Sequence, residues 1–211
     1  MGNANPLKDI EHYAQALKAP RIRESAARLA EQARGDGWSH EDYLAAVLSR
    51  EVTARESSGT QTRIRSAGFP TRKSLEEYNF DYQPSLSREM VAYLGTGVFL
   101  TQARNVVLLG PPGTGKTHLA IGLGIKAAQS GYRVAFATAV DWVVRLKTAH
   151  VEGRLPAELA RLRQIGLIIV DEVGYIPFEQ DRGELVFPVG VVSLRACLTD
   201  SDIESAVWSV G

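Results

Sequence analysis

The fold of this chain is decided by the stretch Gly110-Pro111-Pro112-Gly113-Thr114-Gly115-Lys116-Thr117. It satisfies the pattern G-x-x-x-x-G-K-[ST] in full, and it lies between a short apolar run and a segment of helical character, as that pattern requires. The glycines allow the backbone to curl so that its N–H groups point inward, and the helix that follows adds a partial positive charge. The stretch therefore predicts a phosphate-binding loop.

The residue types in this loop predict a site for ATP with Mg²⁺. Lys116 is expected to reach the β- and γ-phosphates, and the Thr117 hydroxyl is expected to ligate Mg²⁺. The predicted cofactor-binding residues are Gly110, Pro111, Pro112, Gly113, Thr114, Gly115, Lys116, Thr117 and His118. A chance glycine-rich turn is the alternative for the loop, and an ordinary helical position is the alternative for His118.

A second motif, Leu167-Ile-Ile-Val-Asp171-Glu172, is an apolar run that ends in two acids. At the end of a strand, Asp171 is expected to hold Mg²⁺, usually through water. Glu172 is the predicted catalytic residue, because a general base must lie beside the γ-phosphate to polarise the attacking water. An isolated Asp-Glu pair is more often a solvated turn, but this one follows both a buried strand and a phosphate loop.

Strand and helix patterns alternate after residue 105. Apolar runs at 106–109, 133–137 and 167–170 predict buried strands, and 116–130 and 141–151 predict helices between them. Such alternation predicts an α/β fold of the P-loop NTPase class, with a parallel sheet and flanking helices.

The residues before this core predict a small helical domain over 1–72 and a connector over 73–104, with the ATPase core at 105–211. In the helical domain, Gly35 and Gly37 are expected to end one helix, and Ser39 with Asp42 forms a capping box for the next. In the connector, Ser87 to about Leu100 predicts a helix. The aromatic residues Tyr78, Phe80 and Tyr82 are expected to pack the connector onto the core, with a partner surface as the alternative.

Composition sets broad limits on location and partners. The chain has 211 residues, of which 45% are hydrophobic and 23% charged, so a buried core is expected. Lys+Arg and Asp+Glu both number 24, so net charge gives no argument for nucleic acid. Cys197 is the single cysteine, which fits a reducing cytoplasm. No apolar run approaches the length of a membrane helix, so we expect a cytoplasmic protein without a membrane partner.

The segment from Arg50 to Lys73 is rich in basic residues: it contains six lysine or arginine residues and only two acidic ones. Such a cluster can contact DNA phosphates, although a solvated helix face is an equally common reading of a lone cluster. The candidate DNA-binding residues are Arg55, Arg63, Arg65, Arg72 and Lys73.

The segments NVVLLGPPGTGKTHLAIGLG, GYRVAFATA and LIIVDEVGYIPF, with the preceding FDYQPSL, resemble the IstB-like transposition helper ATPases. These are relatives of the DnaC-type helicase loaders. The resemblance covers about Leu7 to Phe187. It implies an AAA+ fold, ATP-dependent assembly of a homo-oligomer on double-stranded DNA, and assistance to a partner transposase. A replicative helicase loader is the alternative function.

After Phe187 the chain departs from the family pattern. The family continues with an Arg-Tyr-Glu-His-like helix and a strand that ends in Thr-Ser-Asn, the polar sensor near the attacking water. A nucleotide string that encodes Pro188 to Gly211 also encodes, with its first base skipped, QLVSSRYEHASLILTSNLPFGRWG, which fits the family. We therefore expect a shifted reading frame and a truncated core. With it come a gap in the sheet that Val191 to Leu198 could fill as a strand, and impaired ATP hydrolysis. A non-catalytic remnant is the further alternative.

Overall fold

The computed structural model describes residues 5–173 and 189–192. The chain divides into two compact units, Met1–Gln61 and Thr62–Gly211. The division falls within helix α3 (His40–Ser66) and not between residues 72 and 73, where the sequence pattern places the domain boundary. Most of the predicted DNA-contacting segment therefore belongs to the second unit.

The first unit consists of α1 (Pro6–Ala16), α2 (Pro20–Asp36) and the larger part of α3. Its buried hydrophobic side chains are small or aliphatic: Ala14, Ala19, Ala26, Leu29 and Val47. Gly37, at φ 69°, ends α2 in the left-handed conformation that glycine accepts without strain. The predicted glycine end of this helix is confirmed for Gly37, whereas Gly35 lies inside α2.

The turn into α3 is a capping box, as predicted. The Asp42 N–H donates to Ser39 Oγ at 3.0 Å, and the Ser39 N–H donates to Asp42 Oδ2 at 3.3 Å. Each side chain thus satisfies a backbone donor that the first turn of a helix leaves without an intrahelical partner.

Glu51 and Arg55, both on α3, form hydrogen bonds with the turn between α1 and α2. Glu51 is 7% exposed, and its Oε2 accepts a hydrogen bond from the Arg21 N–H at 2.9 Å. Arg21 lies in the first turn of α2, which has no N-cap side chain to accept its N–H groups. Arg55 donates to Glu51 and to the carbonyls of Leu17 and Lys18 at the end of α1. Burial raises the pKa of Glu51, but the hydrogen bonds from Arg55 and Arg21 outweigh burial and hold the pKa below its usual range.

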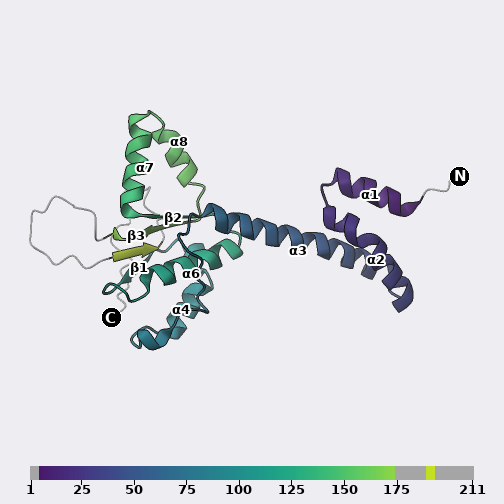
Figure 1. Cartoon of the computed structure of the whole chain (residues 1–211), viewed down its shortest axis with the longest axis horizontal. Helices are drawn as coiled ribbons and strands as arrows, with labels where there is room; N and C mark the ends of the chain where they lie inside the picture. Colours follow the sequence, from purple (N-terminus) through teal and green to yellow (C-terminus); the bar gives the residue numbers. More distant parts are fainter. Residues whose placement is uncertain (1–4, 174–188, 193–211) are drawn as a thin grey trace, which may run out of the picture. The chain divides into compact units, whose positions relative to one another are not determined.

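The second unit is an α/β domain (Figure 1). Its elements are the 3₁₀ turn η1 (Phe80–Tyr82), α4 (Arg88–Gly95), α5 (Val98–Thr101), β1 (Val106–Leu109), α6 (Lys116–Gln129), β2 (Val134–Thr138), α7 (Ala139–Val151), α8 (Leu155–Leu162), β3 (Leu167–Asp171) and β4 (Val189–Val192). The single helix predicted for 87–100 is two helices, because Gly97 adopts φ 77° between α4 and α5. Helix α8 was not predicted.

The sheet has the strand order β1-β4-β3-β2. Strands β2 and β3 are parallel, from Val134 opposite Leu167 to Thr138 opposite Asp171. Strand β4 is antiparallel to both β1 and β3, so β1, β2 and β3 share one direction. Their carboxyl ends therefore meet at one edge of the sheet. The phosphate loop follows β1 at this edge, and Asp171 is the last residue of β3 there.

The predicted α/β fold with a parallel sheet and flanking helices is thus confirmed, and one strand of the sheet runs against the others. Strand β4 fills the position between β1 and β3 where a gap was expected, and it does so in the opposite direction. It begins two residues before the segment predicted to fill that position. Residues 193–198 of that segment lie outside the described residues, as does Cys197.

Helix α6 lies against the sheet and is buried continuously from Leu119 to Ile125. In Figure 1 the sheet lies between α7 and α8 above and α4 and α6 below. Two glycines permit the close approach of α6. A Cβ on Gly122 would lie 2.6 Å from Leu75, and a Cβ on Gly124 would lie 2.8 Å from Ile169 and from Phe69. The helix is therefore held tightly between the sheet and the residues that follow α3.

The connector is part of the core of the second unit and not a free linker. Its residues Tyr78, Leu86, Val91, Phe99 and Leu100 are buried in the same cluster as β1, β3 and α6. Phe80 packs against that cluster, whereas Tyr82 is 85% exposed. Packing onto the core is thus confirmed for two of the three predicted aromatic residues.

We predict that Gly124→Ala destabilises the second unit by about 1–3 kcal/mol, because the new methyl group overpacks a site bounded by Ile169 and Phe69. Gly35→Ala is the control: this helical glycine has open space around its Cα, and the change should stabilise α2 by about 0.5–1 kcal/mol. Urea unfolding followed by circular dichroism measures both changes. Equal effects of the two substitutions would contradict the packing described.

Candidate functional site

The phosphate loop connects β1 to α6 through a backbone that favours glycine. Gly110, Gly113 and Gly115 have φ values of 154°, 83° and 85°. Gly115 is the N-cap of α6. The N–H groups in the first turn of α6, which have no partner within the helix, therefore lie directly after the loop. Pro111 and Pro112 are exposed, and Thr114 Oγ1 donates to the Pro111 carbonyl at 2.9 Å. The arrangement suits an anion held by backbone donors.

Lys116 folds back over this loop. Its Nζ donates to the carbonyls of Gly110 at 2.7 Å and Pro111 at 2.8 Å. Desolvation lowers the pKa of Lys116, and the nearby Asp171 carboxylate partly offsets that effect. The ammonium group is therefore held inside the loop, close to the place where a bound phosphate would need a cation.

Thr117 and Asp171 meet although 54 residues separate them. Thr117 Oγ1 donates to Asp171 Oδ2 at 2.8 Å, and Asp171 is only 8% exposed. The two residues come from the first turn of α6 and the end of β3, which the shared direction of β1 and β3 brings to one edge. A hydroxyl and a carboxylate oxygen at this spacing are hard donors of the kind that Mg²⁺ accepts.

Glu172 follows directly after β3 and is exposed. Its φ of 57° is uncommon for a residue with a Cβ, and such strain concentrates at functional positions. The structure thus places Glu172 beside Asp171 at the same edge of the sheet as the phosphate loop.

Tyr78 contacts the phosphate loop through both its hydroxyl group and its ring, and the sequence alone did not predict these contacts. Its hydroxyl donates to the Thr114 carbonyl at 2.8 Å, and its ring lies against Gly115, where a Cβ would come within 2.7 Å of Tyr78 Cε2. Burial raises the pKa of Tyr78, so the hydroxyl stays protonated and able to donate. The aromatic pattern indicated that Tyr78 is buried, but no sequence signal pairs it with a loop 36 residues away.

His118 faces the connector. Its Nε2 lies 2.8 Å from the Ser74 carbonyl, which can only accept, so Nε2 carries the proton and donates. Its ring also contacts the ring of Tyr78 edge to face, with centroids 5.4 Å apart. Of the predicted loop residues, His118 is therefore the one whose side chain is engaged with the connector.

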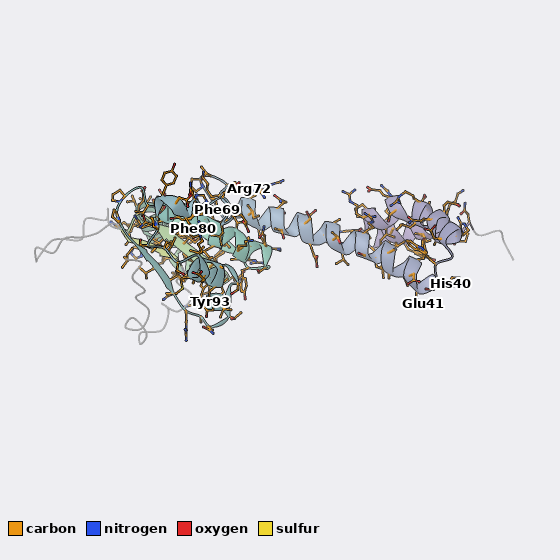
Figure 2. The ribbon with its side chains drawn as sticks, turned by 90° about the horizontal axis from the view of Figure 1, so that it is seen from below. His40, Glu41, Phe69, Arg72, Phe80 and Tyr93 are labelled. Atoms are coloured by element: carbon orange, nitrogen blue, oxygen red, sulfur yellow. The ribbon has the colours of Figure 1, made fainter. Side chains whose placement is uncertain are left out.

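The five candidate DNA-binding residues fall into two groups. Arg55 is engaged within the first unit as described above, and Arg63 Nε donates to the Ala128 carbonyl near the end of α6 at 2.7 Å. Arg65, Arg72 and Lys73 are exposed, and their side chains make no hydrogen bond or ion pair within residues 5–173. Figure 2 shows Phe69 and Arg72 beyond the last turn of α3. The second group is the one available to a partner.

The described residues contain neither a cluster of metal-ligand side chains nor a membrane-spanning helix. No group of three or more His, Cys, Asp or Glu residues gathers there to hold a metal ion. No helix in this part of the chain has both the length and the apolar character needed to cross a membrane.

Comparison with known proteins gives a consistent set of matches. The chain matches the family described as IstB-like ATP binding protein over residues 12–203. It is 35% identical over 181 residues to an ATP-binding protein, named as putative, of insertion sequence IS21 from Pseudomonas aeruginosa. The aligned region spans 86% of this chain and 68% of that protein. A similarly named protein of insertion sequence IS5376 from Geobacillus stearothermophilus is 33% identical over 180 residues, covering 85% and 72%.

The family match continues past Phe187, where the sequence pattern predicted the resemblance to end. The shifted reading frame therefore stays a prediction, and the nucleotide sequence of the codons after Phe187 would test it.

We predict that Tyr78→Phe weakens the affinity for ATP with Mg²⁺ about two- to tenfold, because a hydrogen bond worth about 0.5–1.5 kcal/mol no longer fixes Thr114. The ring stays, so the fold should be kept. Tyr93→Phe, on the half-exposed face of α4, is the matched control and should have no effect. Isothermal titration calorimetry measures the affinities, and equal values for wild type and Tyr78→Phe would remove the proposed support of the loop.

Proposed function

Because this chain belongs to the family of IstB-like ATP-binding proteins, we propose that it is an ATP-dependent helper of DNA transposition that acts with a transposase. The nucleotide part rests on one observation, the 2.8 Å hydrogen bond between Thr117 and Asp171, which joins the loop hydroxyl to the acid that ends β3. The transposition part rests on the relatives, which are named as proteins of insertion sequences.

In this proposal, Thr117 and Asp171 hold Mg²⁺ together with the phosphates of ATP. A magnesium ion of this kind needs only one or two protein oxygens, because phosphates and water complete its shell. That requirement fits a site without a larger acidic cluster among the described residues. When bound, the ion would neutralise phosphate charge, and Lys116 would add a cation from inside the loop.

Glu172 is the proposed catalytic acid for ATP hydrolysis. It follows the metal-side acid directly, and its side chain is exposed at the edge of the sheet that carries the phosphate loop. A carboxylate there can orient and polarise that water.

Double-stranded DNA is the proposed partner of Arg65, Arg72 and Lys73. These exposed cations lie at the end of α3 and the start of the connector. The same connector reaches the phosphate loop through the contacts of Tyr78 and His118. A segment that touches both the loop and the basic residues supports coupling between nucleotide and DNA binding.

A transposase is the proposed protein partner, and a replicative helicase is the alternative. The relatives favour the transposase, because their names assign them to insertion sequences. We also propose that the chain assembles on DNA as an ATP-dependent homo-oligomer, as the resemblance to transposition helpers implies.

We predict that ATP with Mg²⁺ stabilises the wild-type protein and that Lys116→Ala abolishes the effect. At a ligand concentration about a hundredfold above Kd, binding adds about 2.7 kcal/mol to the free energy of unfolding. Thr117→Ala should remove the part of the shift that depends on Mg²⁺. Differential scanning fluorimetry measures these shifts. Lys147→Ala, an exposed lysine of α7, is the control and should behave as wild type. A folded wild-type protein without any shift would refute the nucleotide assignment.

We predict that Arg72→Glu combined with Lys73→Glu weakens binding to a DNA duplex and flattens its salt dependence. Each phosphate contact contributes about 0.9 to the slope of log K against log salt concentration, so the loss of two contacts should lower the slope by roughly 2. Fluorescence anisotropy at several salt concentrations measures the slope. Lys147→Glu combined with Arg163→Glu, at two exposed positions, makes the same change in net charge and is the control. A slope that both double variants share with wild type would leave Arg72 and Lys73 as a solvated surface.

A further inference from the structure

A hollow of about 290 Å³ lies at the edge of the sheet opposite the phosphate loop. Residues at the start of β2 and just before the start of β3 line it, so it lies at the amino ends of these strands. The phosphate loop and Asp171 lie at the opposite, carboxyl ends. The residues that matter for its chemistry are Thr62, Arg63, Ser66, Arg133, Arg161 and Gln164. The hollow lies wholly within the second unit and is separate from the nucleotide site.

The lining of this hollow is cationic and rich in hydrogen-bond donors. Three guanidinium groups contribute to it, together with two hydroxyl groups and an amide, and no acidic residue is among the described residues that line it. Arg133 donates to the Gln164 amide oxygen at 3.0 Å, a neutral partner that leaves the positive charge uncompensated. Forked guanidinium groups flanked by hydroxyl donors match the oxygens of a phosphate group.

Arg161 is partly compensated by Glu158, but that carboxylate is shared. It accepts two hydrogen bonds from Arg161 at 3.1 Å each and also pairs with Arg145 at 2.6 Å. One carboxylate therefore serves two arginines, and the group as a whole remains positive. Arg161 is held in place by this contact while its charge still contributes to the hollow.

The walls of the hollow are fixed by backbone hydrogen bonds. The Arg133 carbonyl accepts the N–H groups of Gly166 at 2.9 Å and Leu167 at 3.1 Å, which ties the starts of β2 and β3 together. The Phe136 N–H donates to the Ala67 carbonyl at 2.7 Å, which ties the end of α3 to β2. A site that is ordered before its ligand arrives loses less entropy on binding.

We infer that this hollow binds a phosphate of a DNA backbone through Arg133 and Arg161, with Thr62, Ser66 and Gln164 around them. The inference rests on the proposed DNA partner and adds a contact site in the ATPase unit itself, remote from the nucleotide. Such a contact positions the protein on DNA without reading its sequence.

The test compares three variants with wild type for binding to a fluorescent duplex of about 20 base pairs across a salt series. Arg133→Gln should lower the affinity about tenfold, because a charged hydrogen bond is lost, and should reduce the salt slope by about 1. Arg133→Lys keeps the charge and should keep the slope. Arg163→Gln, an exposed arginine outside the hollow, should match wild type. Affinity for ATP with Mg²⁺ should be unchanged in all three, which confirms that the fold and the phosphate loop are intact.

Two results would overturn the inference and leave the proposed function in place. One is duplex binding by wild type that Arg133→Gln does not alter. The other is a stabilisation of wild type by inorganic phosphate, measured with ATP and Mg²⁺ bound, that Arg133→Gln removes while duplex binding stays unchanged; the hollow would then take a free anion. If wild type binds no duplex at any salt concentration, the DNA part of the proposed function fails together with the inference.

Discussion

The hydrogen bond between Thr117 and Asp171 depends on the shared direction of β1 and β3. Because both strands end at the same edge, the loop after β1 and the acid that ends β3 meet there. Side chains alternate between the two faces of a strand, so a register shift of one residue in β3 would turn Asp171 away from Thr117. The tight packing of α6, through Gly122 and Gly124, maintains that alignment at the same time.

Local sequence signals predicted most of the elements and the chemistry of the nucleotide site. The loop glycines, the capping box at Ser39 and the apolar run that ends in Asp171 are all short-range patterns, and the structure places each where the pattern requires. The break at Gly97 was missed, although two glycines, Gly95 and Gly97, lie there, because glycine within a helical pattern is compatible with both an intact and a broken helix.

The remaining features depend on contacts between residues that are distant in the chain. Tyr78 reaches Thr114, Arg63 reaches Ala128 and Glu51 reaches the start of α2, and no local pattern encodes any of these pairs. The cluster of basic residues had the same limit. The sequence did not distinguish the five candidate DNA-binding residues from one another, whereas the structure separates those bonded to carbonyl groups from those that face solvent. The compact units divide inside a continuous helix, directly after the polar run 57–61, which contains Gly59. The sequence pattern placed the boundary later, because the glycine and proline at Gly68 and Pro70 are the stronger turn signals.

The polarity of β4 has a consequence for how a nucleotide could be sensed. The residue that ends a strand at the nucleotide edge can point a polar group at a γ-phosphate, and β1 and β3 both end there. Strand β4 starts at that edge, where Val189 is opposite Leu109, and its last residue, Val192, is opposite Val106 at the far side of the sheet. In this topology β1 and β3 bring their last residues to the edge that carries the phosphate loop, whereas β4 brings its first residue there.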